Sequence, residues 1–248
     1  MNVNAGEVYE ETIAELENII NYANEIEITK SLVNYETKRE QIIKKIYFII
    51  KRIFDVFCAF IGIIALIPIA TITKIGYLII GDKKSIFYKQ KRIGKKGKII
   101  YIYKFRSMVY NADETLGELL KDPKYKEEWD KNQKLENDPR ITKIGKILRK
   151  TSLDELPQFI NVLNGDMSVI GPRPLVEGEL DAHNGSHKIY ESVRPGISGW
   201  WAANGRSNID YDTRLELEYY YCKNCSIWLD IKCILKTIKI VVFRKGAR

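Results

Sequence analysis

The chain has 248 residues, of which 45% are hydrophobic and 29% are charged, and its formal net charge is +8. This excess of Lys and Arg favours acidic partners such as anionic lipid or phosphorylated substrates. The sequence has neither zinc-finger spacing nor the aromatic and basic pattern of a single-strand binder, so we expect no nucleic-acid partner.

The first 50 residues predict an amphipathic helical arm. Apolar side chains recur at mixed intervals of three and four between Ile13 and Tyr22, which is the repeat of one helix face. Residues 1–24 include acidic side chains but no Lys or Arg, unlike the basic start of a secretory signal. We therefore assign residues 1–50 to an interaction or docking arm.

An apolar run from Val56 to Thr73 follows, interrupted by Pro68 and flanked by Lys and Arg on both sides. A straight helix through it is roughly 27 Å long, against a hydrocarbon core of about 30 Å. Pro68 lacks an amide hydrogen and its ring crowds the carbonyl four residues earlier, so we expect a break there. Positive flanks stay in the cytoplasm, so we expect residues 51–80 to form a re-entrant membrane segment. A spanning helix and a buried core helix are the alternatives.

Residues 81–248 predict one cytoplasmic catalytic domain of α+β class in which helix dominates. The β-prone stretches 86–88 and 98–103, joined through residues 94–97, predict a hairpin. The last segment places apolar side chains from Trp228 to Val242 on one helical face and lysines on the other. This basic amphipathic helix suits either a membrane surface or the domain core. Other helices are expected to begin near Asp113, Ile144, Leu153 and Tyr211.

Asp113 and Glu114, at the start of one of these helices, are the first candidates for catalysis. An Asp with the ordinary pKa of about 3.9 is ionised at neutral pH and is a ready nucleophile. A divalent cation and arginines could neutralise an anionic diphosphate so that a carboxylate can approach phosphorus. The structural alternative is capping, because Asn111 and Glu114 have the spacing of a capping-box variant.

Several arginines lie within or beside Gly, Pro or helix-boundary motifs, which present rigid side chains to ligands. Arg173 is the sharpest case, because Gly171-Pro172-Arg173-Pro174 fixes the backbone on both sides of the guanidinium group. A solvent-exposed turn is the alternative there. The arginines in such settings are Arg106, Arg140, Arg149, Arg173, Arg194 and Arg206.

Two other acidic patterns carry less weight. Ser152 and Glu155 have the spacing of a capping box, which favours a structural role at a helix start. Asp210 and Asp212 form a D-x-D pattern, which some glycosyltransferases use to hold a metal and a nucleotide diphosphate. A three-residue pattern of this kind has little specificity.

The ordered set of motifs over residues 51–243 resembles the bacterial sugar transferase family, the monotopic phosphoglycosyl transferases that load a polyprenol phosphate carrier. Each motif alone is modest, whereas their order is highly specific. The motifs are Lys51-Arg52-x-x-Asp55, Lys104-Phe105-Arg106-Ser107-Met108, Asp113-Glu114, Asp138-Pro139-Arg140-Ile141-Thr142, Thr151-Ser152-Leu153-Asp154-Glu155-Leu156-Pro157-Gln158, Asn161-Val162-Leu163-Asn164-Gly165-Asp166-Met167-Ser168, Gly171-Pro172-Arg173-Pro174, Arg194-Pro195-Gly196-Ile197-Ser198-Gly199 and Asn204-Gly205-Arg206.

This resemblance implies a reaction that initiates the assembly of a surface glycan such as a capsule or an exopolysaccharide. Asp113 would attack the β-phosphorus of a nucleotide diphosphate sugar, usually a UDP-sugar, with release of UMP. Polyprenol phosphate would then accept the sugar phosphate from Asp113. Glu114 would complete the catalytic pair, and Mg²⁺ would bind at Asp113. Arg140 and Arg173, with Arg106 as a weaker candidate, would contact the substrate phosphates.

The resemblance also implies that the enzyme works on the cytoplasmic face of the bacterial membrane, in contact with lipid, and it leaves a homo-oligomer open. Two departures from the family pattern stand out. Many members have Ser where Ile67 precedes Pro68, and many have Gln at the position of Ala202. The second departure affects sugar or nucleotide contacts, so the sequence does not identify the sugar.

Two other functions compete with this reading. A metal-dependent glycosyltransferase would use Asp210 and Asp212, transfer the sugar alone and release UDP. A non-catalytic membrane-surface scaffold would need only the N-terminal arm and the C-terminal amphipathic helix. The scaffold leaves the paired carboxylates and the ordered arginines unexplained.

Overall fold

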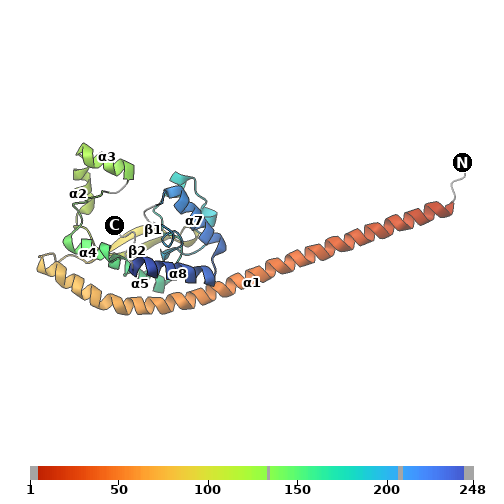
Figure 1. Ribbon diagram of the computed structural model, residues 1–248, viewed down its shortest axis with the longest axis horizontal. Helices are drawn as coiled ribbons and strands as arrows, with labels where there is room; N and C mark the ends of the chain where they lie inside the picture. The colour runs from red at the N-terminus through yellow and green to blue at the C-terminus, as the bar shows by residue number, and fades with distance from the viewer. Residues whose placement is uncertain (1–4, 133–134, 206–208, 243–248) are drawn as a thin grey trace. The chain divides into compact units, whose positions relative to one another are not determined.

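The computed structural model describes residues 5–132, 135–205 and 209–242, and the chain divides into two compact units, residues 1–50 and 51–248 (Figure 1). Helix α1 (Ala5–Ile79) forms the first unit and continues into the second. Residues 5–50 are helical, and their assignment to an interaction or docking arm stays a prediction. Among the described residues, one helix is long and apolar enough to cross a membrane, over Thr37–Ile79 with a mean hydropathy of 2.5.

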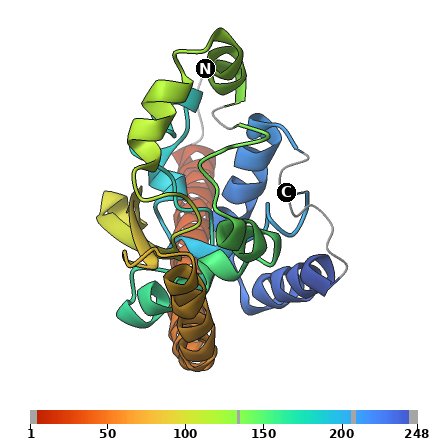
Figure 2. The same ribbon diagram turned by 90° about the vertical axis from the view of Figure 1, so that its left-hand side faces the viewer.

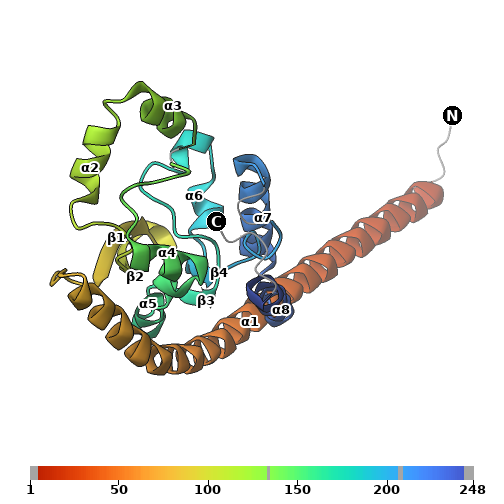
Figure 3. The same cartoon turned by 60° about the vertical axis from the view of Figure 1, so that its left-hand side comes forward.

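Helix α1 continues through Pro68 without interruption. The break predicted there, and with it the re-entrant membrane segment, is therefore not confirmed. Proline removes one backbone donor, and the Thr71 hydroxyl donates a hydrogen bond to the Ile67 carbonyl at 3.0 Å. Such side-chain bonds, like proline itself, bend helices without ending them. Within residues 51–79 the helix is curved (Figures 1 and 3).

The predicted hairpin is confirmed by β1 (Phe87–Ile93) and β2 (Ile99–Phe105), which pair antiparallel from Phe87 opposite Phe105 to Ile93 opposite Ile99. Their connection contains the short 3-10 helix η1 (Lys95–Gly97). Lys96 and Gly97 both have positive φ, at 59° and 71°, which closes a tight turn. A second, parallel pair joins β3 (Ser168–Ile170) to β4 (Gly196–Ser198).

Helix dominates the rest of the domain, as the sequence predicted. One expected start is displaced: the segment that begins at Leu153 is a 3-10 turn, and the α-helix begins only after Pro157. The helices are α2 (Ala112–Leu119), α3 (Pro123–Asn132), α4 (Lys143–Lys150), η2 (Leu153–Glu155), α5 (Gln158–Asn164), η3 (Asp181–His183), α6 (His187–Tyr190), α7 (Tyr211–Asn224) and α8 (Ile227–Val242).

The capping box predicted at Ser152 is wrong. Ser152 adopts a left-handed conformation with φ of 56° and its side chain makes no capping hydrogen bond. Glu155 instead accepts a hydrogen bond from the Lys104 ammonium at 2.9 Å. The acidic side chain therefore ties η2 to strand β2 rather than closing a helix start.

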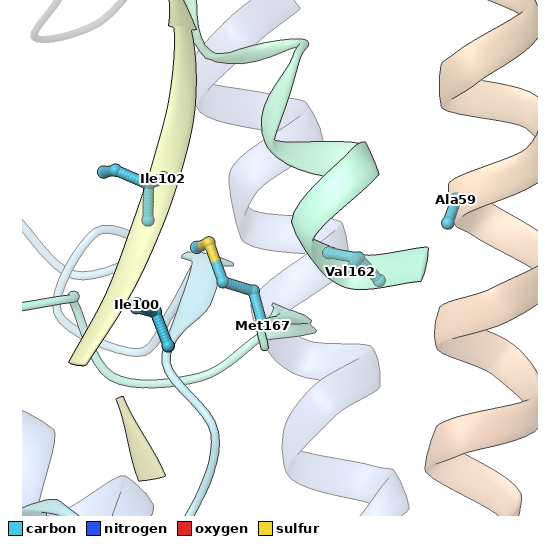
Figure 4. Packing of buried hydrophobic residues seen from close by; sticks show 5 residues of the cluster. All are labelled: Ala59, Ile100, Ile102, Val162 and Met167. Atoms are coloured by element: carbon cyan, nitrogen blue, oxygen red, sulfur yellow. The ribbon is translucent and has the colours of Figure 1, made fainter. Parts of the chain in front are cut away.

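The core of the domain lies where residues 51–79 of α1 meet the hairpin and α5. One cluster joins Ala59 on α1 to Val162 on α5, and Figure 4 shows both with Ile100, Ile102 and Met167. A second cluster contains Leu66, Tyr77, Ile86, Phe105 and Leu148. Helices α2 and α3 lie on the side of the domain away from this part of α1 (Figures 2 and 3).

Polar contacts hold both ends of the α1 segment 51–79 on the same domain. The Arg52 guanidinium donates to the carbonyls of Val162 and Leu163 at the end of α5, at 2.6 and 2.9 Å. Buried Asp55 accepts from the hydroxyl of Ser168, also at 2.9 Å. At the other end, the Tyr77 hydroxyl donates to the Arg106 carbonyl at 2.6 Å. The whole segment is thus bound along the surface of one domain.

Candidate active site

Asp113 and Glu114 lie in the first turn of α2, and both are exposed. The capping alternative is wrong, because Asn111 makes no side-chain capping hydrogen bond. The Thr115 hydroxyl donates a hydrogen bond to the Asn111 carbonyl at 2.9 Å, and this contact at the helix start involves neither carboxylate. Across the described part of the chain, neither Asp113 nor Glu114 has a side-chain hydrogen bond or ion pair. Both carboxylates are therefore free to meet a ligand.

Arg140 lies next to the start of α2, with its charge paired to Asp138. Its guanidinium binds Asp138 through two nitrogens, at 2.9 and 2.7 Å, and reaches the carbonyl of Ala112 at 3.4 Å. Burial raises the pKa of Asp138, but the hydrogen bonds from Arg140 outweigh it and hold that pKa below its usual range. Trp129 lies 5.5 Å from the guanidinium as a stacking partner. Arg140 therefore contacts the residue next to Asp113 and is buried among fixed partners.

Arg106 is occupied by partners within the protein. Its guanidinium donates to the Ser85 carbonyl at 2.7 Å and to Asp82 at 2.8 Å, and it stacks on the Tyr77 ring at 4.4 Å. It reaches the Met108 carbonyl at 3.3 Å. These contacts fix the chain as it leaves β2 toward α2. The phosphate contact expected for Arg106 stays a prediction.

Arg173 lies in the loop after β3, and the loop is as rigid as its sequence predicts. There is no room for a side chain at Gly171, where a Cβ would lie 2.4 Å from the Arg194 carbonyl oxygen. The Arg173 amide donates to Glu218 at 2.9 Å, and its carbonyl accepts from the Tyr190 hydroxyl at 3.0 Å. No hydrogen bond or ion pair between described residues connects Arg173 to α2. Its contact with substrate phosphate stays a prediction.

The sequence reasoning missed two arginines near Arg173. Arg92 on β1 and Arg214 on α7 both approach Glu179, at 4.0 and 3.4 Å. Arg92 stands among the lysines that follow the apolar run, where the sequence predicts only a basic membrane flank. One sequence feature could have pointed to these arginines. Glu218 lies three residues after Leu215 and four residues before Cys222, which is the spacing of a helix face turned toward the core. A carboxyl at such a position calls for nearby cations.

The carboxylates at α2 fit a magnesium ion that arrives with its substrate. Within the described ranges, no group of three or more His, Cys, Asp or Glu side chains could hold a metal by itself. Mg²⁺ is usually bound by one or two carboxylates together with substrate phosphates and water. Asp113 and Glu114 are free carboxylates, and one of them together with substrate phosphates and water would meet that requirement.

Asp210, the first residue of the D-x-D pattern, has a structural role. Asp210 is the N-cap of α7, where its carboxylate accepts from the Thr213 amide at 2.8 Å and from the Thr213 hydroxyl at 2.7 Å. These hydrogen bonds lower the pKa of Asp210. Both carboxylate oxygens are therefore engaged in capping, which argues against a metal-dependent glycosyltransferase site at Asp210 and Asp212.

Comparison with known proteins places these features in a family. The undecaprenyl-phosphate galactose phosphotransferase of Salmonella typhimurium is 45% identical over 199 residues, which are 80% of this chain and 41% of that protein. The exopolysaccharide production protein ExoY of Sinorhizobium fredii is 41% identical over 198 residues, 79% of this chain and 87% of that protein. The UDP-N-acetylgalactosamine-undecaprenyl-phosphate N-acetylgalactosaminephosphotransferase of Aeromonas hydrophila is 37% identical over 209 residues, 82% of this chain and 46% of that protein. The chain thus spans less than half the length of the Salmonella and Aeromonas relatives.

The family model described as bacterial sugar transferase matches residues 46–244, which include all of the domain's core, the carboxylate pair and the arginines described above. The N-terminal arm lies almost entirely outside the match. The chain therefore belongs to the bacterial sugar transferase family.

Proposed function

We propose that the protein transfers a sugar 1-phosphate from a nucleotide diphosphate sugar, expected to be a UDP-sugar, to polyprenol phosphate and releases UMP. The observation that carries this proposal is the free, exposed pair Asp113 and Glu114 beside the buried Arg140. Names of relatives support the substrates: one is an undecaprenyl-phosphate galactose phosphotransferase, and another names UDP-N-acetylgalactosamine as donor. The product would be the first lipid-linked intermediate of a surface glycan.

The reaction proceeds in two displacements at one phosphorus atom. A carboxylate oxygen of Asp113 attacks the β-phosphorus, and the bond from that phosphorus to the bridging oxygen breaks, so that the bridging oxygen leaves on UMP. The sugar phosphate is then an acyl phosphate on Asp113. An oxygen of polyprenol phosphate attacks the same phosphorus, the bond to Asp113 breaks, and the carboxylate is restored. Each step exchanges one phosphorus–oxygen bond for another.

This attack requires positive charge near Asp113, and because Arg140 is already paired with Asp138, Mg²⁺ would supply most of it. An ionised carboxylate and a diphosphate repel each other, and the Arg140 guanidinium is held next to α2 by Asp138 and by the Ala112 carbonyl. Asp113, with Glu114 beside it, would hold Mg²⁺ together with the donor phosphates. The metal would neutralise negative charge on the diphosphate. Glu114 would assist the acceptor step or position the metal.

We propose that the protein attaches to the cytoplasmic face of the membrane without crossing it. Arg52 and Tyr77, near the two ends of the apolar segment, bind the same domain. Both ends of the segment would therefore lie on the same side of the membrane. The face of α1 turned away from the domain is apolar and exposed, and α8 adds a similar row. These exposed side chains are Ile53, Phe57, Phe60, Ile61, Ile64, Ile67, Ile72, Ile75, Trp228, Leu235 and Ile238.

Labelling from outside the cell tests the proposed topology. Lys44→Cys and Lys83→Cys are each introduced into a variant without the native cysteines. Each new thiol should react with a membrane-impermeant reagent only after the cell membrane is permeabilised. The two positions flank the apolar segment. Reaction at one of them in intact spheroplasts would show that the segment crosses the membrane.

The identity of the released nucleotide tests the reaction. The full chain, purified in detergent, is mixed with Mg²⁺, polyprenol phosphate and a panel of UDP-sugars, and the nucleotide is identified by chromatography. We expect UMP from the wild type and none from Asp113→Asn. Glu118→Gln is the matched control, because this exposed residue of the same helix pairs only with Lys121 among the residues described. UDP as the product, or full activity in Asp113→Asn, would overturn the proposal.

A further inference from the structure

A cavity lies between the turn of the first hairpin and the chain that follows β3, and its volume is about 320 Å³. Two backbone hydrogen bonds hold its opposite walls together. The Ile93 amide donates to the Leu175 carbonyl at 2.8 Å, and the Lys96 amide donates to the Glu191 carbonyl at 2.9 Å. The walls of the cavity are therefore fixed by backbone contacts.

Much of the wall is apolar. Leu175, Leu180 and Tyr190 belong to one buried cluster of the core, and Pro172 lines the cavity beside them. Tyr190 is 6% exposed, and its hydroxyl is engaged with the Arg173 carbonyl at 3.0 Å, so the ring adds apolar surface to the wall. Sites for small molecules combine such apolar walls with a few polar groups. The cavity thus suits an organic group rather than a simple ion.

Three carboxylates line the same cavity: Glu177, Asp181 and Glu191. His187 lies between two of them, with its Nδ1 2.6 Å from Glu191 and its Nε2 2.7 Å from Asp181. These contacts involve one oxygen of each carboxylate, and the second oxygen accepts no hydrogen bond from a described residue. A Cβ at Gly97 would lie 3.1 Å from that second oxygen of Glu191, so the glycine keeps it uncovered. Two carboxylate oxygens are therefore available as hydrogen-bond acceptors.

The charges on the wall balance one another, which restricts the kind of ligand. The hydrogen bond of His187 to Glu191, together with that to Asp181, raises the pKa of the imidazole and favours its charged form. The third carboxylate is paired with Lys91 at 2.6 Å, and Arg173 adds a further positive charge to the wall. A phosphate would therefore meet three carboxylates, and a cation would find no surplus of negative charge. A pure hydrocarbon would cover the free acceptors without pairing them, which costs free energy.

The group that meets these requirements is uncharged, carries several hydrogen-bond donors and has an apolar surface. A sugar ring does so, because its hydroxyl groups lie around the ring edge and its C–H groups form apolar faces. We propose that the cavity binds a sugar ring, with hydroxyl groups donating to Asp181 and Glu191 and one ring face against Tyr190. The ring is either the sugar of the nucleotide donor, an assignment that rests on the proposed function, or a free saccharide bound apart from the reaction. Asp181 and Glu191 are then the residues that select the sugar.

Binding measurements without turnover test the cavity. The full chain, in a detergent without a sugar headgroup, is titrated with UDP, with methyl glycosides of a panel of hexoses and N-acetylhexosamines, and with UDP-sugar analogues of the same panel. Methylene replaces the bridging oxygen of the analogues, so they are not cleaved there and their affinity does not depend on the proposed reaction. We expect Asp181→Asn and Glu191→Gln each to weaken a sugar-bearing probe at least about tenfold, because a hydrogen bond to a charged group is worth roughly that factor or more. Glu216→Gln, an exposed carboxyl outside the cavity, should change nothing.

The pattern of losses identifies the source of the sugar. Losses for the UDP-sugar analogues with UDP unchanged would assign the cavity to the donor's sugar, and losses for the methyl glycosides alone would assign it to a separate saccharide. Val176→Trp, at a position that is 40% exposed, fills the cavity without changing a charge and should give the same losses if the carboxylate variants do not fold.

Three results would overturn the proposal. One is an equal loss of affinity for UDP, and another is unchanged affinity for every probe in folded variants. The third is a wild type that binds the analogues no better than UDP and binds no methyl glycoside. Because UMP release is measured separately, failure of this site and failure of the proposed reaction are distinguishable.

Discussion

Replacement of Glu218 by Gln should change how the stability of the protein depends on pH. The Glu218 carboxyl is fully buried, and burial raises its pKa from 4.5 to about 8. Between these values the folded protein holds a proton that the unfolded chain releases. The free energy of unfolding of the wild type therefore falls as pH rises through this window. Gln has the same shape and can still accept the Arg173 amide, but it does not titrate.

The size of the effect follows from the two pKa values. At 1.36 kcal/mol per pKa unit, a shift from 4.5 to about 8 makes the wild type lose about 3.5 kcal/mol between pH 5 and pH 8 relative to Glu218→Gln. A domain of this size changes its melting temperature by roughly 2 to 4 °C per kcal/mol, so the two curves should diverge by about 10 °C.

Thermal unfolding followed by tryptophan fluorescence in phosphate-free buffers measures this divergence. The variant should be close to the wild type at pH 5 and should gain on it steadily toward pH 8. Glu216→Gln, an exposed carboxyl on the same helix, is the matched control and should run parallel to the wild type. A gap between wild type and Glu218→Gln that does not change with pH would refute the reasoning about the buried proton.

Three further substitutions test the fold and the assignment of the site. Gly145→Ala should prevent stable folding, because its Cβ would lie 1.9 Å from the Ser107 carbonyl oxygen; circular dichroism and recovery of soluble detergent-bound protein measure this. Asp210→Ala removes both hydrogen bonds to Thr213, so it should lower the melting temperature while UMP release stays intact. Loss of turnover at an unchanged melting temperature would contradict the capping role. Tyr77→Phe should cost about 1 to 3 kcal/mol of unfolding free energy by leaving a buried carbonyl without its donor, and an unchanged urea midpoint would argue against this anchor of α1.

Local patterns in the sequence predicted the elements that depend on local physics. The β-prone stretches on either side of residues 94–97 predicted the hairpin, and the apolar stripe from Trp228 to Val242 predicted α8. Capping at Asn111 and Ser152 failed because spacing alone does not fix the backbone geometry that a cap requires. Ser152 is left-handed, so its side chain cannot serve the helix that follows.

The behaviour at Pro68 differs from the local rule. That rule predicts a break, but the helix continues through the proline, and Asp55 and Tyr77 bind the domain on either side of it. In the candidate active site, too, motifs identify single residues but not their proximity. Sequence motifs identified Asp113 and Arg140, whereas their proximity through the Ala112 carbonyl joins residues far apart in the chain.

The meeting of Arg92 and Arg214 at Glu179 cannot be predicted from motifs for a related reason. Arg92 and Arg214 stand more than a hundred residues apart, and each resembles an ordinary surface arginine in its local sequence. Only the folded chain shows that both approach Glu179. Charges that converge from separate elements leave no periodic signal in the sequence.

The central claim is that Asp113 carries the sugar phosphate covalently, and intact-protein mass spectrometry tests it most directly. The wild type is incubated with Mg²⁺ and a UDP-sugar without polyprenol phosphate and is then quenched in acid. We predict a mass gain equal to one sugar phosphate, located on Asp113 by peptide mapping and lost when polyprenol phosphate is added. Asp113→Asn should show no adduct. A wild-type enzyme that releases UMP only when the acceptor is present, with no adduct under any condition, would contradict the account.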